Sequence, residues 1–161
     1  MSIFSQLMTA VKFVIVVGLL SAVLGEALPR RWFHWDRFPY GPFRWEKSGK
    51  FYEIIRIRKW KDRLPDKSRH ARHTFRKQME GHTNPENLVR FLQETCVAEL
   101  VHGVLVLLSG LLYCYIPTPF GLFLSILYGL SNIPFMLIQR YNRPRLLRLL
   151  QRQRQKEQKG A

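Results

Sequence analysis

The sequence predicts an all-α integral membrane protein with about three transmembrane helices. Its 161 residues are 47% hydrophobic, yet Lys and Arg number 26 against 11 Asp and Glu. The two populations are separated along the chain: the 37 residues from Gly103 to Gln139 include no charged residue, whereas residues 30–99 carry 17 Lys and Arg against 9 Asp and Glu. Only Cys96 and Cys114 are present, without a CxxC motif. These patterns exclude a soluble globular domain, a disulfide-stapled secreted module and a zinc knuckle.

Residues 1–28 are predicted to form an N-terminal transmembrane helix or an uncleaved signal-like segment. The segment is apolar from Ile3 to Leu28, apart from Lys12 and Glu26. A cleaved signal peptide is the alternative, because Gly25-Glu26-Ala27 is loosely similar to a cleavage site. Signal peptides carry their positive charge before the apolar run, whereas here Arg30 and Arg31 follow it. The charge distribution therefore favours a retained span.

Residues 29–84 are predicted to be an interfacial region rich in basic and aromatic residues. The mixture of rings and arginines from Arg31 to Trp45 suits the lipid headgroup layer. Residues 45–64 have apolar positions at roughly helical spacing, which predicts an amphipathic helix on the membrane surface, although Ile55 to Arg58 also alternate like a strand. Residues 66–82 suggest a basic loop or short helix, and His70 and His73 there lack the further ligands of a metal site. The region has no nucleic-acid-binding motif.

Residues 85–139 are predicted to form a helical hairpin. Asn84-Pro85-Glu86 is a helix start, with a capping residue, a proline at the first position and an acidic first turn. Pro117 and Pro119 divide the uncharged run, which leaves spans at about 100–116 and 120–138. A basic tail, 140–161, follows. Because cytoplasmic segments are enriched in Lys and Arg, we expect the basic loop and tail to lie on the cytoplasmic side of the cell membrane.

A polar stripe crosses both arms of the predicted hairpin. Glu99 and His102 share one face of the first arm, and Asn132 and Gln139 lie on one face of the second. If the arms pair about Thr118, Glu99 lies level with Leu137, and His102 lies level with Pro134. Placing an ionisable residue in or beside a transmembrane span costs free energy, and such residues usually have a function. We therefore expect these residues to converge with the arginines that follow the second span.

This stripe predicts an acyl-transfer site. Glu99 would orient His102, which would remove a proton from a hydroxyl as the general base. The neighbouring arginines would bind an anionic group through their planar guanidinium groups. The predicted substrate-binding residues are Asn132, Gln139, Arg140, Asn142, Arg143 and Arg145, and no metal is expected. A purely structural role is the alternative, in which Glu99 pairs with Arg140 or Arg143 to tie the hairpin ends together.

Four longer strings of the sequence are more specific than its periodicity. The chain contains Trp-Glu-Lys-Ser-Gly-Lys-Phe-Tyr, Arg-Lys-Trp-Lys-Asp-Arg-Leu-Pro-Asp, Ala-Glu-Leu-Val-His and Asn-Ile-Pro-Phe-Met-Leu-Ile-Gln-Arg-Tyr-Asn-Arg-Pro-Arg-Leu. From about Phe43 to Leu150 it resembles the glycosyl-4,4'-diaponeurosporenoate acyltransferase family (CrtO type). The resemblance supplies no catalytic residues, so the roles of Glu99 and His102 rest on the pattern alone.

The resemblance implies a membrane acyltransferase of staphyloxanthin-like carotenoid biosynthesis. Such an enzyme esterifies a sugar hydroxyl of a glycosylated carotenoid acid, or of a related glycolipid, with a fatty acyl group. The implied partners are membrane lipids, a lipid-linked sugar acceptor and a fatty acyl donor. No cofactor is expected, because the donor, an acyl-CoA or an acyl carrier, is a substrate. The alternative is a small non-enzymatic membrane protein that binds anionic lipid or a partner protein.

Overall fold

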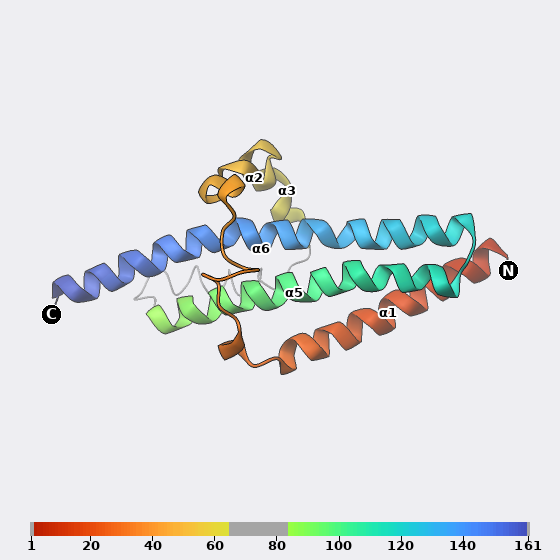
Figure 1. Ribbon diagram of the computed structural model, residues 1–161, viewed down its shortest axis with the longest axis horizontal. Coiled ribbons are helices and arrows are strands. Elements are labelled where there is room, and N and C mark those ends of the chain that lie inside the picture. Colours follow the sequence, from red (N-terminus) through yellow and green to blue (C-terminus); the bar gives the residue numbers. More distant parts are fainter. Residues whose placement is uncertain (1, 65–83, 161) are drawn as a thin grey trace. The chain divides into compact units, whose positions relative to one another are not determined.

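Three long helices dominate the computed structural model, which describes residues 2–64 and 84–160 (Figure 1). They are α1 (Ile3–Ala27), α5 (Pro85–Tyr115) and α6 (Pro119–Gly160). Each contains a segment long and apolar enough to cross a membrane, and the described residues contain no strand. The predicted fold class is confirmed. The predictions for residues 66–82, including the two histidines, lie outside the described residues.

The chain divides into two compact units, and α5 and α6 contribute to both. The first unit contains α1 with residues 97–136, and the second contains the described residues among 30–96 and 137–160. In the first unit, α1 begins at Ser2, whose hydroxyl accepts a 3.2 Å hydrogen bond from the backbone N–H of Ser5. This contact caps the helix.

The buried face of α1 consists of small and polar residues, namely Gln6, Ala10, Ser21 and Gly25. A Cβ atom on Gly25 would lie 3.0 Å from a methyl group of Val101, so the absence of a side chain allows α1 to approach α5 closely. The other faces of α1 expose large apolar side chains, including Phe4, Leu19 and Val23. Small residues between helices and large apolar residues outside are typical of helices packed in a bilayer.

The turn between α5 and α6 is fixed by Thr118. Its hydroxyl accepts a 3.0 Å hydrogen bond from the N–H of Gly121 and donates a 2.7 Å bond to the side-chain oxygen of Gln6. Pro119 opens α6, where a missing N–H costs nothing. A Cβ on Gly121 would overlap the carbonyl oxygen of Ile116, so this turn requires glycine.

Beyond the turn, the hairpin arms pair in the predicted register. Ser125 donates a hydrogen bond to the carbonyl oxygen of Ser109, and a Cβ on Gly129 would lie 2.8 Å from the hydroxyl oxygen of Ser109. His102 contacts Asn132 and Phe135, which bracket the predicted level of Pro134. The pairing about Thr118 is therefore confirmed within the first unit.

The second unit begins with short elements rather than one amphipathic helix. They are η1 (Arg30–Trp32), η2 (Arg44–Gly49), α2 (Lys50–Ile54), α3 (Ile57–Trp60) and η3 (Lys61–Arg63). The continuous helix predicted for residues 45–64 is wrong, because the chain breaks at Arg56, which has a left-handed φ of 51°. Tyr52 and Ile57 are both fully buried in one cluster with Ile138 and Tyr141. Five residues apart, they would diverge by about 140° on a continuous helix, so the break lets both face α6.

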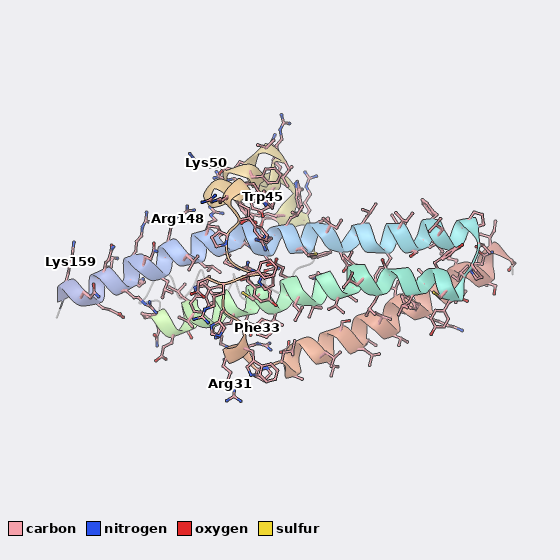
Figure 2. All side chains as sticks on the ribbon, viewed as in Figure 1. Arg31, Phe33, Trp45, Lys50, Arg148 and Lys159 are labelled. Carbon is pink, nitrogen blue, oxygen red and sulfur yellow. The ribbon has the colours of Figure 1, made fainter. Side chains whose placement is uncertain are left out.

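The predicted basic tail is helical in the structure and continues α6. Leu150 is buried with Leu88 and Leu92 of α5, and Trp35, Leu146 and other apolar side chains pack around them. These apolar contacts give the segment one covered face as far as Leu150, and the helix itself continues to Gly160. Figure 2 shows Phe33 turned toward α5, whereas Arg148 and Lys159 project away from α6.

Candidate active site

The first unit holds the predicted catalytic histidine. His102 is half-buried on α5, and its Nδ1 atom lies 2.9 Å from Oδ1 of Asn132 on α6. The imidazole ring also stacks on Phe135, with ring centroids 4.7 Å apart and planes inclined by 10°. Two residues of α6 therefore hold one ring in a defined orientation. The sequence stripe predicted that His102 and Asn132 would meet, and the structure brings them together.

The hydrogen bonds of Asn132 determine which imidazole nitrogen carries the proton. The amide nitrogen of Asn132 donates a 2.9 Å bond to the carbonyl oxygen of Tyr128, so its amide oxygen faces His102. Because an amide oxygen only accepts, Nδ1 of His102 must be the donor. The lone pair of the neutral ring then resides on Nε2. An imidazole in this tautomer is suited to take a proton through Nε2.

Glu99 lies one turn before His102 on α5 and is buried, with 8% of its surface exposed. Its position on the same helix face agrees with the predicted stripe. The partner assigned to Nδ1 of His102 in this structure is Asn132. The predicted role of Glu99 in orienting the imidazole remains a prediction.

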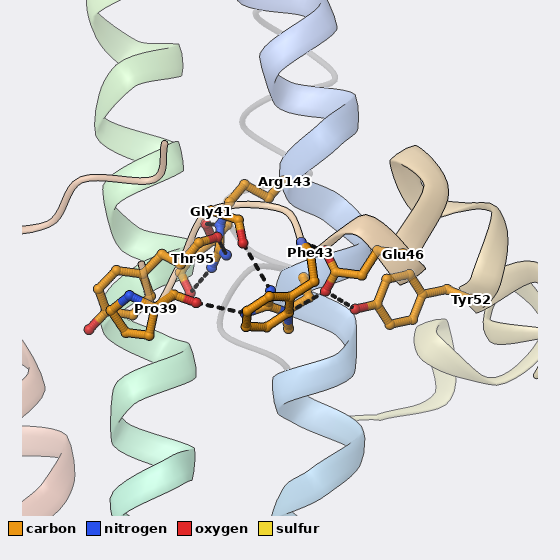
Figure 3. Close-up of polar contacts among 9 residues, drawn as sticks. Pro39, Gly41, Phe43, Glu46, Tyr52, Thr95 and Arg143 are labelled. Atoms are coloured by element: carbon orange, nitrogen blue, oxygen red, sulfur yellow. Dashed lines mark hydrogen bonds and ion pairs between the residues drawn. The ribbon is translucent and has the colours of Figure 1, made fainter. Parts of the chain in front are cut away.

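In the second unit, Arg140 holds the loop that follows η1, in which Figure 3 labels Pro39, Gly41 and Phe43. Its Nε atom donates a 2.5 Å bond to Oε1 of Glu46, and both side chains are buried. Its Nη1 and Nη2 atoms donate to the carbonyl oxygens of Pro39 and Gly41 at 3.2 and 3.1 Å. The guanidinium carbon also lies 4.3 Å from the ring centroid of Phe43. Arg140 therefore holds this loop against α6.

Arg143 makes a second clamp one turn further along α6. Its Nε and Nη2 atoms donate to the hydroxyl and carbonyl oxygens of Thr95 at 3.1 and 3.3 Å. Its Nη1 atom donates to the carbonyl oxygen of Tyr40. With 3% of its surface exposed, Arg143 is buried among protein acceptors. The planar fork that was predicted to hold an anionic substrate here binds backbone and side-chain oxygens of the protein itself.

Glu46 is the centre of this network, where its carboxylate accepts from several donors. Besides Arg140, Tyr52 donates a 2.7 Å bond to Oε1, and the N–H of Phe43 donates a 3.0 Å bond to Oε2. Burial raises the pKa of the Tyr52 hydroxyl, and the neighbouring Glu46 carboxylate raises it further. Tyr52 therefore stays protonated and keeps its role as a donor. Glu46 is therefore one carboxylate partner of Arg140, and the structural alternative, in which Glu99 pairs with Arg140 or Arg143, stays a prediction.

The remaining predicted substrate-binding residues lie on α6 in the second unit. Gln139 is buried, Asn142 is half-buried and Arg145 is exposed. Residues 2–64 and 84–160 contain no group of three or more His, Cys, Asp or Glu side chains suited to hold a metal ion. Glu46, Tyr52 and Thr95 were not predicted from the sequence. The sequence did contain a signal for Glu46 and Tyr52, because both belong to the string Trp-Glu-Lys-Ser-Gly-Lys-Phe-Tyr. Glu46 is the only acidic residue of that string.

Comparisons with known proteins identify the family to which the chain belongs. Residues 29–152 match the family model described as glycosyl-4,4'-diaponeurosporenoate acyltransferase. Proteins of that name from Staphylococcus aureus strains bovine RF122 / ET3-1 and MRSA252 are each 30% identical over 138 residues, which cover 84% of this chain and 82% of the relative. No solved structure matches the chain. The matched range spans the positions of Glu46, His102, Asn132, Arg140 and Arg143. The family name identifies an enzyme rather than a non-enzymatic lipid-binding protein. The chain belongs to the glycosyl-4,4'-diaponeurosporenoate acyltransferase family and is an acyltransferase.

Proposed function

We propose that this enzyme transfers a fatty acyl group to a sugar hydroxyl of a glycosylated carotenoid acid or a related membrane glycolipid. The family name supports the reaction type and the acceptor class. The main support for the proposed catalytic site is the 2.9 Å contact between Nδ1 of His102 and Oδ1 of Asn132. This contact leaves the basic lone pair on Nε2, as general-base catalysis requires.

In the proposed reaction, Nε2 of His102 removes the proton from the sugar hydroxyl as its oxygen attacks the acyl carbonyl carbon. A carbon–oxygen bond forms, and the tetrahedral intermediate then expels the donor's leaving group. The proton on Nε2 passes to that leaving group, so the imidazole returns to its neutral form. Asn132 accepts from Nδ1 throughout and stabilises the transient positive charge on the ring. Phe135 keeps the ring plane fixed.

The surroundings of His102 favour amphiphilic substrates. It lies on a helix whose apolar segment is long enough to span a membrane, and neighbouring side chains such as Val104 and Leu107 are exposed. Exposed apolar residues on a spanning helix face lipid. Both the glycolipid and the acyl chain can therefore reach the site laterally from the bilayer, and the buried Glu99 adds a second polar group on the same face.

The charge distribution supports a location in the cell membrane with the basic segments in the cytoplasm. Single cysteines introduced for Pro117 and Gln155, after Cys96 and Cys114 are replaced by serine, test this orientation with an impermeant thiol reagent. We expect labelling of the Pro117→Cys variant from outside intact cells and protection of the Gln155→Cys variant. The reverse labelling pattern would place the basic tail outside and contradict the orientation.

The function itself is tested by expressing the enzyme in cells that already make a glycosylated carotenoid acid. Mass spectrometry of extracted pigments and glycolipids should show a new species heavier by the mass of one fatty acid minus water. Alkaline hydrolysis should release the fatty acid, because the new bond is an ester. An unchanged lipid profile, with the enzyme present in the membrane fraction, would contradict the proposed acceptor.

A further inference from the structure

A second cluster of cations surrounds Tyr141 on α6. The phenol oxygen of Tyr141 accepts a 3.0 Å bond from Nε of Arg58 and lies 3.4 Å from Nη1 of Arg145. The ammonium nitrogen of Lys61 and the guanidinium carbon of Arg145 lie 5.3 and 5.4 Å from the ring centroid. Three cationic side chains therefore gather around one tyrosine side chain. All belong to the second unit.

This arrangement brings like charges together. Glu53, at 2.5 Å from Arg58, offsets one of them. Arg58 and Arg145 nevertheless direct donors at the same oxygen atom, which holds two guanidinium groups close to each other. Mutual repulsion of such groups is relieved when an anion binds beside them. Arg58 and Arg145 are exposed, so an anion from solvent or from a lipid headgroup can reach them.

The hydroxyl of Tyr141 completes the site. A phenol oxygen has two lone pairs and one hydrogen atom. Both lone pairs face guanidinium donors, so the O–H bond is directed toward a further acceptor. An acceptor at that position would receive one bond from Tyr141 and further bonds from the two arginines. The hydroxyl of Tyr141 and the N–H groups of the two arginines that are not directed at Tyr141 or Glu53 match the several oxygen atoms of a phosphate group.

We propose that Arg58, Tyr141 and Arg145 form a binding site for a phosphate group. The phosphate belongs either to a nucleotide-type acyl donor or to the headgroup of an anionic phospholipid, since the recognising chemistry is the same. Exposed basic residues at three- and four-residue steps extend the positive face from Arg145 along α6, namely Arg148, Arg152, Lys156 and Lys159. This row would attract a molecule that carries several negative charges. The inference rests on the proposed function only for the identity of the donor.

The test uses purified full-length enzyme in nanodiscs of phosphatidylcholine. Coenzyme A is titrated by calorimetry in one arm. In the other arm, nanodiscs that also contain phosphatidylglycerol are analysed by mass spectrometry for lipid retained on the protein. Tyr141→Phe removes the hydroxyl and keeps the ring packed against Tyr52 and Ile138. We expect Tyr141→Phe and Arg145→Gln to weaken either the binding of coenzyme A or the retention of phosphatidylglycerol about tenfold or more. A loss of this size is expected when a hydrogen bond to a charged group is removed.

Arg154→Gln is the matched control. Arg154 is exposed on α6, nine residues from Arg145 and so about half a turn away from it around the helix. The control removes the same charge and should change binding less than about twofold. Weakened coenzyme A binding identifies a donor phosphate, and weakened retention of phosphatidylglycerol identifies a lipid headgroup. Equal binding by wild type and Tyr141→Phe in both arms, or equal weakening by Arg154→Gln, would overturn the site.

His102→Ala separates this inference from the proposed function. The phosphate site does not include His102, so this variant should bind coenzyme A or phosphatidylglycerol as the wild type does. Normal phosphate binding by a wild-type enzyme that forms no ester would contradict the proposed function and leave the phosphate site standing. Ester formation by an enzyme that binds neither coenzyme A nor phosphatidylglycerol would support the proposed function and contradict the phosphate site.

Discussion

The His102–Asn132 pair of the first unit and the Arg140–Arg143 clamp of the second use buried polar groups in opposite ways. Both arginines direct their donors at oxygen atoms of the protein, including three backbone carbonyls of residues 39–41. His102 is instead anchored through one nitrogen and keeps a basic lone pair on the other. Polar groups with every donor engaged hold a structure together, whereas a group anchored on one side is suited to react.

The two regions also differ in the kind of residue that supplies the partner. Arg140 meets a carboxylate, and a buried ion pair needs well-placed partners to offset the cost of desolvation. Asn132 is neutral, so it orients His102 without adding a charge to the membrane-spanning part of the chain. The comparison predicts that substitutions in the first region reduce catalysis, and that substitutions in the second reduce the amount of folded enzyme.

The largest expected effect is on catalysis by His102→Ala. A positioned general base contributes about 10²- to 10⁴-fold, so ester formed per mole of inserted enzyme should fall by that factor while insertion persists. If Glu99 orients the imidazole, Glu99→Gln should be nearly as severe, and the double variant little worse, because residues that act as a unit are not additive. Normal specific activity in His102→Ala would show that the pair is structural.

Glu46→Gln should cause the largest loss of stability. It removes the charge that neutralises buried Arg140, and loss of one partner from a buried pair costs about 3–5 kcal/mol. The denaturation midpoint of detergent-solubilised enzyme should fall, with normal activity in the protein that remains folded. Glu53→Gln is the control, because the ion pair of Glu53 with Arg58 is exposed and its loss should leave the midpoint nearly unchanged.

Arg143→Lys should destabilise by about 2 kcal/mol, because an ammonium group keeps the charge but cannot reach Thr95 and Tyr40 at the same time. A substrate-binding role, as predicted from the sequence, implies a different result. Activity per mole would then fall although the amount and stability of the enzyme are unchanged. Thermal denaturation and specific activity of the same preparation distinguish the two roles.

Asn132→Ala should lower activity about tenfold, which corresponds to the loss of one orienting hydrogen bond of about 1.4 kcal/mol. The substitution leaves the imidazole in place but removes the acceptor at Nδ1, so the ring can adopt the other tautomer. Asn132→Asp restores an acceptor and should recover part of the activity. Equal activity of Asn132→Ala and wild type would mean that another group orients His102.

The smallest effect concerns packing of the hairpin. A methyl group at Gly129 would meet the Ser109 hydroxyl oxygen at 2.8 Å, so Gly129→Ala should destabilise by about 1 kcal/mol. Gly110 lies on the facing helix, and a Cβ there would have no neighbouring atom within 4 Å, which makes Gly110→Ala the matched control. The control should be neutral or slightly stabilising, because alanine favours helices. Equal midpoints for both variants would contradict the close approach of α5 and α6.

The spans and the hairpin register could be predicted because they depend on local properties. Charge-free length, two prolines and steps of three or four residues are visible in the sequence, and they place His102 level with Pro134, within one turn of Asn132. The partners of Arg140 could not be found in this way. Glu46 lies 94 positions away in sequence, and its approach depends on how residues 39–46 fold.

The break at Arg56 was missed for a related reason. Burial of both Tyr52 and Ile57 against α6 overrides the helical preference of their neighbours. Helical periodicity contains no information about the contacts of Tyr52 and Ile57 with α6, so it predicted one continuous helix. Contacts between residues distant in sequence therefore determine the structure of those parts of the second unit that sequence patterns predicted poorly.

In the proposed reaction, Nδ1 of His102 keeps its proton in the bond to Asn132, so the imidazole handles one proton in each catalytic cycle. With the histidine proposed as a base and not as an acyl carrier, the acyl group would pass directly from donor to acceptor. Both substrates must then be bound at once, and initial rates should follow a sequential rather than a ping-pong pattern. A 19.1 kDa protein with three candidate spans must accordingly accommodate two lipid chains side by side during each turnover.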